Sequence, residues 1–311
     1  MTPLYPGDQL DHYFIENVAA RGGMATIFRA RDLRTDTIVA LKVPHPDAEC
    51  DPVMFDRFRR ETQIGEQIDH PAVMKVFSET RRSRPYIAAE WIDGTPLRAI
   101  LDEQKKLPVW RAQRLGIAIS EALEHLHNNG VVHRDLKPEN VMVTAGDNVK
   151  LIDFGLASKA GGRRLTFGKF SRIMGTADYI SPEQIQGKRG DARSDIYALG
   201  VILYEMLAGR TPWQGENPFT VMNLRTLQDP DPLRSLNGEV PAELEDVIDK
   251  ALRRDPARRY SDAGEFISAL NDPRPEPEPV AEVPARKPWL LSLAMIPVSI
   301  FLMLLYVASH Q

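Results

Sequence analysis

The most informative part of this 311-residue chain is His133-Arg134-Asp135-Leu136-Lys137-Pro138-Glu139-Asn140. It brings an aspartate and an asparagine within five residues, and Asp153-Phe154-Gly155 adds a second aspartate after two short apolar runs, 141–144 and 149–152. Carboxylate and amide oxygens that converge at the ends of two strands are the ligands that a hard divalent cation prefers. The spacing therefore predicts a site for such a cation.

A lysine near the end of an apolar run lies upstream, in Ile38-Val39-Ala40-Leu41-Lys42. An ammonium group on such a strand needs an anionic partner to offset its desolvation. Glu61, on a helix predicted over 52–68, is the candidate partner.

A glycine-containing turn precedes that lysine, in Ala20-Arg21-Gly22-Gly23-Met24-Ala25-Thr26-Ile27. Without a Cβ, its backbone N–H groups can approach a phosphate closely. Taken alone, the turn is weak evidence for a phosphate site and is more typical of an ordinary β-hairpin.

With Gly175-Thr176-Ala177-Asp178-Tyr179-Ile180-Ser181-Pro182-Glu183 added downstream, the order of these motifs resembles the eukaryotic-type (Hanks-type) protein kinases, particularly membrane-anchored bacterial serine/threonine kinases. The resemblance runs from about Leu10 to Leu270. It implies an α+β kinase domain over 10–271, with a small β-rich N-lobe (about 10–92) and a larger helical C-lobe (about 93–271). It also implies transfer of the γ-phosphoryl group of ATP to Ser/Thr hydroxyls of protein substrates, with autophosphorylation of the activation loop.

The resemblance assigns roles to single residues. Asp135 would orient the attacking hydroxyl and accept its proton, and Lys137 would neutralise charge on the transferred group. Lys42 would hold the α- and β-phosphates, while Asn140 and Asp153 would bind Mg²⁺, with Mn²⁺ as an alternative. The nucleotide-binding set that it implies is Val18, Ala19, Ala20, Arg21, Gly22, Gly23, Met24, Ala25, Thr26, Ile27, Ala40, Lys42, Glu61, Glu90, Ile92, Asn140 and Asp153.

Two further matches belong to the scaffold of the family. Asp195, in Ser194-Asp195-Ile196-Tyr197-Ala198-Leu199-Gly200, resembles the aspartate that braces the catalytic loop. Glu183 and Arg259 resemble a buried ion pair beneath the activation segment.

The chain also departs from the family pattern. Ala20 and Ala25 stand where the first and third glycines of the loop usually lie, so we expect weaker ATP binding rather than its loss. Gly65 stands where a bulky apolar side chain usually packs against the phenylalanine that corresponds to Phe154. We therefore hypothesise that a homodimer or another partner closes the helix that carries Glu61, and that a Gly65→Leu variant is more active.

The segment 158–176, which the resemblance implies is the activation loop, interleaves basic residues with Thr166 and Ser171, which makes these two residues the candidate phosphosites. A phosphate on either could pair with Arg134 and order the segment. The alternative is a solvated loop.

The composition of the chain argues against some kinds of binding partner and bond. Lys and Arg number 39 against 43 Asp and Glu, so the net charge is −4 and no nucleic-acid partner is expected. The single cysteine, Cys50, cannot close an internal disulfide. The histidines show no metal-site spacing.

The ends of the chain differ from its centre. Residues 1–9 form an extension, and the proline- and acid-rich segment 272–288 predicts a spacer. Residues 289–307 carry no charge and would extend about 28 Å as a helix, which predicts one transmembrane span before a short tail, 308–311. Because Arg286 and Lys287 precede the span, we expect a single-pass protein of the bacterial inner membrane with a cytoplasmic kinase domain.

Two alternatives to an active protein kinase stay open: a nucleotide-binding pseudokinase scaffold, favoured by the three departures, and a small-molecule kinase of related fold.

Hydrophobic periodicity predicts the remaining helices and strands. The expected strands are 13–18, 26–30, 37–43, 73–77, 86–92, 141–144 and 149–152, and the expected helices besides 52–68 are 109–129, 194–208, 242–252 and 263–270.

Overall fold

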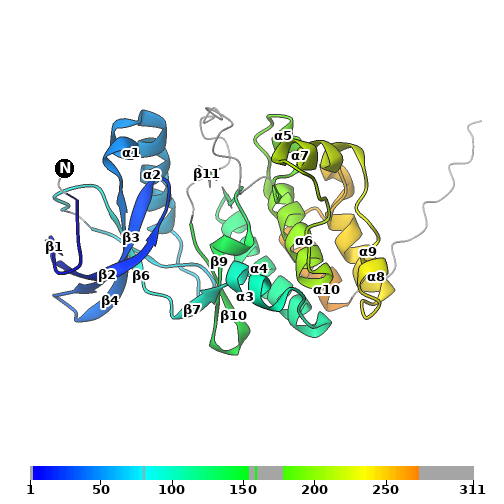
Figure 1. Ribbon diagram of the computed structural model, residues 1–311, viewed down its shortest axis with the longest axis horizontal. Helices are drawn as coiled ribbons and strands as arrows, with labels where there is room; N and C mark the ends of the chain where they lie inside the picture. Colours follow the sequence, from blue (N-terminus) through cyan, green and yellow to red (C-terminus); the bar gives the residue numbers. More distant parts are fainter. Residues whose placement is uncertain (1–2, 80, 154–157, 160–177, 273–311) are drawn as a thin grey trace, which may run out of the picture. The chain divides into compact units, whose positions relative to one another are not determined.

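The computed structural model describes residues 3–79, 81–153, 158–159 and 178–272. They belong to the first of two units, Met1–Glu276, and form a β-rich lobe and a helical lobe (Figure 1). The second unit, Pro277–Gln311, contains the predicted span 289–307 and lies outside the described residues. Within the described ranges, no helix combines the length and the apolar character that crossing a bilayer requires.

The N-lobe is built on a six-stranded antiparallel sheet in the order β1-β2-β3-β4-β6-β5. Side chains alternate across it, so Leu41 and Val43 of β4 enter the N-lobe core while Ala40 and Lys42 face the other side. The strands are β1 (Gln9–Leu10), β2 (Tyr13–Arg21), β3 (Ala25–Asp32), β4 (Thr37–Pro44), β5 (Val76–Phe77) and β6 (Ile87–Glu90).

The predicted strand at 73–77 is shorter in the structure. Val73 leaves the sheet and forms an isolated parallel bridge with Leu151 of the C-lobe. Only Val76–Phe77 pair with β6, because the segment before them connects the two lobes.

One long helix, α2 (Pro52–Gly65), follows the short α1 (Pro46–Cys50) and packs beside the sheet (Figure 1). Asp51 caps α2, because its carboxylate accepts hydrogen bonds from the N–H groups of Val53 and Met54. Phe58 packs against a buried cluster formed by β5 and β6. The helix ends at Gly65, three residues before the predicted end.

The C-lobe is organised around α6, whose residues from Ser194 to Ala208 are all buried. A helix that is buried on every side lies at the centre of a domain, and α4 packs against both α6 and α10. The helices are α3 (Leu97–Gln104), α4 (Val109–Asn128), α5 (Pro182–Ile185), α6 (Ala192–Ala208), α7 (Pro218–Leu227), α8 (Leu233–Leu236), α9 (Ala242–Ala251) and α10 (Ala263–Asn271).

Short strands in the C-lobe position the residues near the lobe junction. The hairpin of β9 and β10 closes with a hydrogen bond from the Ile152 N–H to the Asn140 carbonyl (2.9 Å). Asn140 and Asp153 therefore stand at the open end of one hairpin. The strands are β7 (Gly94–Pro96), β8 (Val131–Val132), β9 (Val141–Thr144), β10 (Asn148–Leu151) and β11 (Ser158–Lys159), with 3₁₀ turns η1 (Pro138–Asn140), η2 (Ala145–Asp147) and η4 (Pro256–Arg258).

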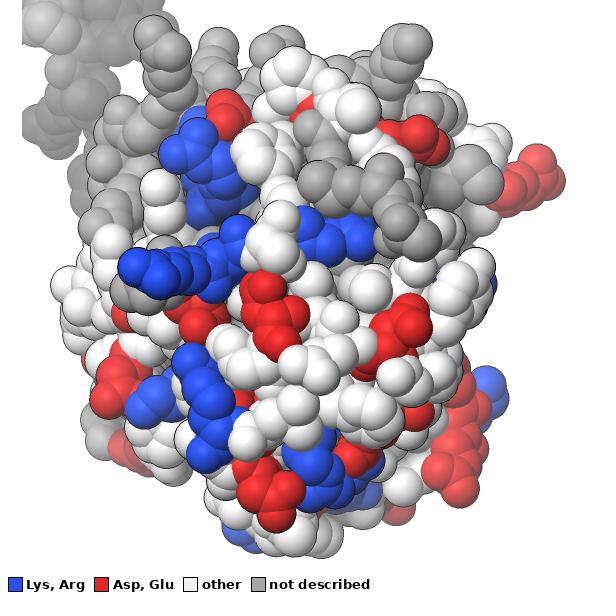
Figure 2. Space-filling model, turned by 90° about the vertical axis from the view of Figure 1, so that its left-hand side faces the viewer, with Lys and Arg blue, Asp and Glu red and all other residues white. Residues whose placement is uncertain are grey.

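Charges of both signs are mixed on the outer face of the N-lobe, where Asp and Glu lie among Lys and Arg (Figure 2). Several charged side chains of the N-lobe form ion pairs. Glu16 binds both Arg29 and Arg31, and Arg34 bridges Asp32 and Glu79.

Candidate active site

The lysine of β4 is paired with the glutamate of α2, as the sequence predicts. Lys42 Nζ lies 2.6 and 2.8 Å from the two carboxylate oxygens of Glu61, and 3.4 Å from Asp153 Oδ1. Burial opposes the charge on Lys42, but the two carboxylates raise its pKa above the ordinary value. Burial raises the pKa of Glu61 to about 7, although the charge of Lys42 opposes the rise. Uptake of a proton by Glu61 would therefore weaken the pair.

The loop that carries Asp135 is anchored on α6 by Asp195. Its two carboxylate oxygens accept the backbone N–H groups of His133 (2.9 Å) and Arg134 (2.8 Å), as expected for a brace. His127 Nε2 lies 2.8 Å from the same carboxylate, a contact that the sequence did not indicate. Arg134 has φ +64°, a conformation that costs a non-glycine residue about 1–3 kcal/mol and that the Asp195 anchor maintains.

Asp135 is the best-placed acceptor of a proton among the described residues. Lys137 Nζ donates to its Oδ2 at 3.0 Å, while its Oδ1 is buried and has no hydrogen-bond partner within the described part of the chain. Burial raises the pKa of Asp135, and Lys137 opposes the rise. A buried carboxylate oxygen of this kind can accept a hydrogen bond from a hydroxyl that enters the site.

Asn140 and Asp153 fit the predicted cation site. The Asn140 amide nitrogen donates to the Asp135 carbonyl at 2.8 Å, which leaves its Oδ1 as the ligand atom. Asp153, with φ +67°, is 42% exposed and turned toward Lys42. In sites of phosphoryl transfer, Mg²⁺ is usually held by one or two protein groups together with substrate phosphates, and this pair would supply the protein part.

The glycine turn is the tip of the hairpin of β2 and β3, where the Gly22 N–H donates to the Ala25 carbonyl (2.9 Å). A Cβ on Gly23 would meet nothing within 4 Å, and one on Gly22 would make only ordinary contact. Neither glycine has a positive φ. The packing of the chain itself does not require glycine at these positions, so open space above the turn is consistent with a phosphate ligand.

Of the other predicted nucleotide residues, Ala40, Lys42 and Glu90 lie on the same sheet, and Ile92 follows its strand β6. Lys42 pairs in register with Ile27, and Ala40 pairs with Ala89. The Glu90 carboxylate binds Lys150 Nζ (2.6 Å) and the Lys75 N–H (2.8 Å). Both contacts go to Oε1 of Glu90, and the Glu90 backbone N–H donates to the Lys75 carbonyl (2.9 Å), so residues of the chain itself hold Glu90 in place.

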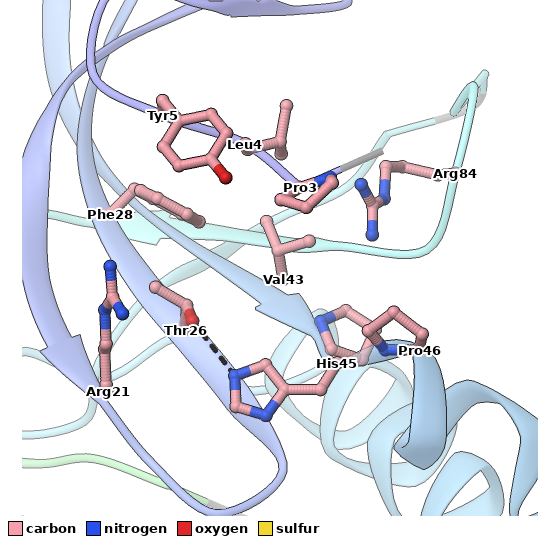
Figure 3. Close-up of a pocket in the computed structure, with 11 residues that line it drawn as sticks. Pro3, Leu4, Tyr5, Arg21, Thr26, Phe28, Val43, His45, Pro46 and Arg84 are labelled. Carbon is pink, nitrogen blue, oxygen red and sulfur yellow. Dashed lines mark hydrogen bonds between the residues drawn. The ribbon is translucent and has the colours of Figure 1, made fainter. Parts of the chain in front are cut away.

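A pocket of about 210 Å³ lies on the N-lobe sheet, away from the catalytic loop (Figure 3). Arg21 and Arg84 line it, and Thr26 Oγ1 lies 3.0 Å from His45 Nε2. It contains none of the charged residues paired above. We therefore place the candidate site at Lys42, Asp135 and Asp153, and not at this pocket.

The expectation for Gly65 needs correction. A Cβ at this position would lie 2.4 Å from Val76 Cγ2, so β5 already occupies the space that a larger side chain needs. The Lys42–Glu61 pair is also formed with glycine in place. Gly65 is therefore where α2 approaches β5 closely, and not a gap beside α2.

The Gly65→Leu variant is accordingly expected to be less stable and no more active than the natural chain. Overpacking of this kind costs about 1–3 kcal/mol, measured as a lower urea midpoint of unfolding. Gly238→Leu is the control, because a Cβ there meets nothing within 4 Å. An increase in activity in Gly65→Leu would restore the earlier hypothesis.

Sequence reasoning missed several side chains that hold the segment after the activation loop. Tyr179 donates to Glu205 of α6 (2.6 Å), and Arg98 of α3 donates to both. Gln184 donates to the Arg134 carbonyl (3.2 Å). No local motif signals these contacts, because their partners are far apart in the sequence.

The predicted pair of Glu183 and Arg259 is present, with two hydrogen bonds of 2.9 and 2.7 Å. Arg134, the expected partner of a phosphate, donates to the carbonyls of Arg189 (3.1 Å) and Gly190. The candidate phosphosites Thr166 and Ser171 lie outside the described residues.

The chain is similar to known bacterial kinases. The serine/threonine-protein kinase PknB of Mycobacterium tuberculosis is 36% identical over 297 residues, which cover 93% of this chain and 47% of PknB. A probable serine/threonine-protein kinase of Streptomyces coelicolor is 39% identical over 271 residues, which cover 85% of this chain and 40% of that protein. The chain thus spans less than half the length of these curated relatives.

A solved structure is also similar. The kinase domain of Mycobacterium tuberculosis PknI superposes with a TM-score of 0.69 at 27% identity, covering 88% of this chain and all of that domain. The family model described as the protein kinase domain matches residues 15–273. The chain therefore belongs to the protein kinase family.

Proposed function

We propose that this chain is a serine/threonine protein kinase that transfers the γ-phosphoryl group of ATP to hydroxyls of protein substrates. The observation that carries the proposal is the connected set of charges from Lys42 and Glu61 of the N-lobe to Asp153 of the C-lobe. The names of the relatives, PknB and the Streptomyces protein, support the serine/threonine class.

Each residue has a defined task in this proposal. Asp135 receives the acceptor hydroxyl at its buried oxygen and takes its proton, while Lys137, 3.0 Å away, compensates negative charge on the group in transfer. Lys42 binds phosphate oxygens of ATP, and Glu61 keeps its ammonium in position. Asn140 and Asp153 would hold Mg²⁺, which when bound compensates phosphate charge.

The direct test is incorporation of labelled phosphate from γ-labelled ATP into a general protein acceptor by the full chain. The matched control is Lys42→Met, which removes the ammonium and leaves Glu61 without its partner. We expect label with the natural chain and at least about a 100-fold loss in the variant. ATP binding without transfer by the natural chain would instead favour the pseudokinase scaffold.

We further propose the domain boundaries given above, autophosphorylation at Thr166 or Ser171, and tethering of a cytoplasmic kinase domain to the inner membrane by residues 289–307. The alternation of basic residues with the hydroxyls of Thr166 and Ser171 supports autophosphorylation, and the uncharged length of residues 289–307 supports the membrane tether. Phosphosite mapping on the active full chain tests the former. Retention of the full chain in membranes after a carbonate wash, and its release on deletion of 289–311, tests the latter.

A further inference from the structure

A buried arginine of α7 has no role in the chemistry described so far. Arg225 is 0% exposed, and its two terminal nitrogens each donate to a backbone carbonyl, Nη1 to Ile180 and Nη2 to Asp178, both at 2.5 Å. Burying a guanidinium is costly unless it is hydrogen-bonded. Both of these hydrogen bonds, which help to offset that cost, go to one short segment, Asp178–Ile180.

The segment that Arg225 holds lies beside the proposed base. Tyr179 and Ile180 line the same small gap in the protein, of about 10 Å³, as Asp135. Gln184, just beyond the segment, donates to the carbonyl of Arg134, the residue before Asp135. The segment that Arg225 holds therefore lies directly against the loop that carries Asp135.

Arg225 is the first of four stacked side chains. Its guanidinium lies 5.3 Å from the ring centre of Trp213, and Trp213 stacks on Tyr197 at 6.3 Å with an angle of 11°. The guanidinium of Arg259 lies 4.7 Å from the ring of Tyr197 on the stack's other end and binds Glu183. Cation–π contacts are strong when they are shielded from water. The stack thus joins both ends of residues 178–183 to the C-lobe core.

We propose that Arg225 is a positioning residue for the protein substrate: it holds the backbone of Asp178–Ile180 at the height that lets an acceptor hydroxyl reach Asp135. This inference rests on the proposed kinase function and extends it to the acceptor side of the site. It separates two halves of the reaction. The residues proposed to hold ATP lie on the sheet and on the β9–β10 hairpin, whereas the contacts of Arg225 given above go to Asp178, Ile180 and Trp213.

The test compares Arg225→Met and Arg225→Lys with Val221→Ala in the full chain. Arg225→Met keeps the length of the side chain and removes both donors, while Arg225→Lys keeps the charge but cannot bridge two carbonyls in a fork. Val221 is buried on the same helix and makes no hydrogen bond to residues 178–180, so its truncation controls for general loss of packing.

We expect kcat/KM for a protein acceptor, myelin basic protein, to fall about 10- to 100-fold in Arg225→Met and less in Arg225→Lys. The KM for ATP and the slow hydrolysis of ATP by water should change less than twofold, as in Val221→Ala. Equal losses of protein phosphorylation and ATP hydrolysis would overturn the inference, as would an Arg225→Met variant that matches Val221→Ala.

Amide hydrogen exchange gives a second readout that needs no activity. Exchange at Tyr179–Ser181 should become faster in both Arg225 variants and stay unchanged in Val221→Ala; unchanged exchange in Arg225→Lys would also overturn the inference. If the natural chain transfers no phosphate, the proposed function fails. If the natural chain is active and the Arg225 variants are too, only this inference fails.

Discussion

Asp135→Asn is expected to reduce phosphoryl transfer about 10²- to 10⁴-fold, the range that a positioned general base contributes. Asparagine has nearly the same shape, and its carbonyl oxygen can still accept a hydrogen bond from Lys137. It cannot take a proton, and it removes the negative charge that Lys137 now faces at 3.0 Å. The loss should therefore appear in kcat, while the KM for ATP changes little.

The measurement is initial-rate phosphorylation of a protein acceptor at saturating ATP. Asp229→Asn is the matched control, because the Asp229 carboxylate is 77% exposed on the surface and should give natural activity. Asp135→Asn activity within fivefold of the natural chain would exclude Asp135 as the base.

The same carboxylate predicts the acid limb of the pH profile. Burial raises the pKa of Asp135 and Lys137 lowers it, so activity should fall with acid at a pH above the ordinary aspartate value of 3.8. Lys137→Met removes the lowering charge, and the midpoint of the acid limb should move to higher pH. The readout is the midpoint of the kcat profile rather than the rate itself, since Lys137 also acts on the transferred group. A midpoint that moves to lower pH would contradict the assignment.

Much of this site follows from the sequence because strong local patterns carry it. The β9 range matches the expected 141–144 residue for residue, and α6 and α10 begin and end within two residues of expectation. Lys42 on an apolar strand demands an anion, and Glu61 on the next helix supplies it. These predictions succeed because the hydrophobic period and the cost of a buried charge are both local and large.

The sequence predicts less where long-range packing decides. Helix α7 is short, and one of its three buried residues is Arg225, so its apolar pattern is broken by the residue that matters most. Gly65 reads as a missing side chain, whereas Val76 fills that space from a strand eleven residues further along. Neither fact is visible until both partners are placed in three dimensions.

Breaking the buried pair of Glu183 and Arg259 is expected to cause the largest loss of stability, about 3–5 kcal/mol. Arg259 is fully buried and binds both carboxylate oxygens, and Ser194 Oγ donates to one of them at 2.6 Å. Arg259→Met leaves a charged Glu183 without its cation. The urea midpoint of unfolding should fall accordingly, while Arg258→Met, at the exposed neighbouring position, should change the free energy of unfolding by less than about 0.5 kcal/mol.

The contribution of the Glu183–Arg259 pair to the free energy of unfolding should also depend on pH. Burial alone would raise the pKa of Glu183, but Arg259 and Ser194 together hold it below the ordinary value of 4.5. The unfolded chain therefore binds this proton first, so the pair's contribution is complete above about pH 4.5 and is lost as the pH falls through the lower folded-state pKa. Arg259→Met should flatten this acid dependence as well as lower stability at neutral pH.

A double variant, Glu183→Gln with Arg259→Met, should lose less stability than the sum of the single losses, because neither buried charge then stands alone. Additive losses would show that the two side chains act independently, and would contradict the coupling that their two hydrogen bonds predict.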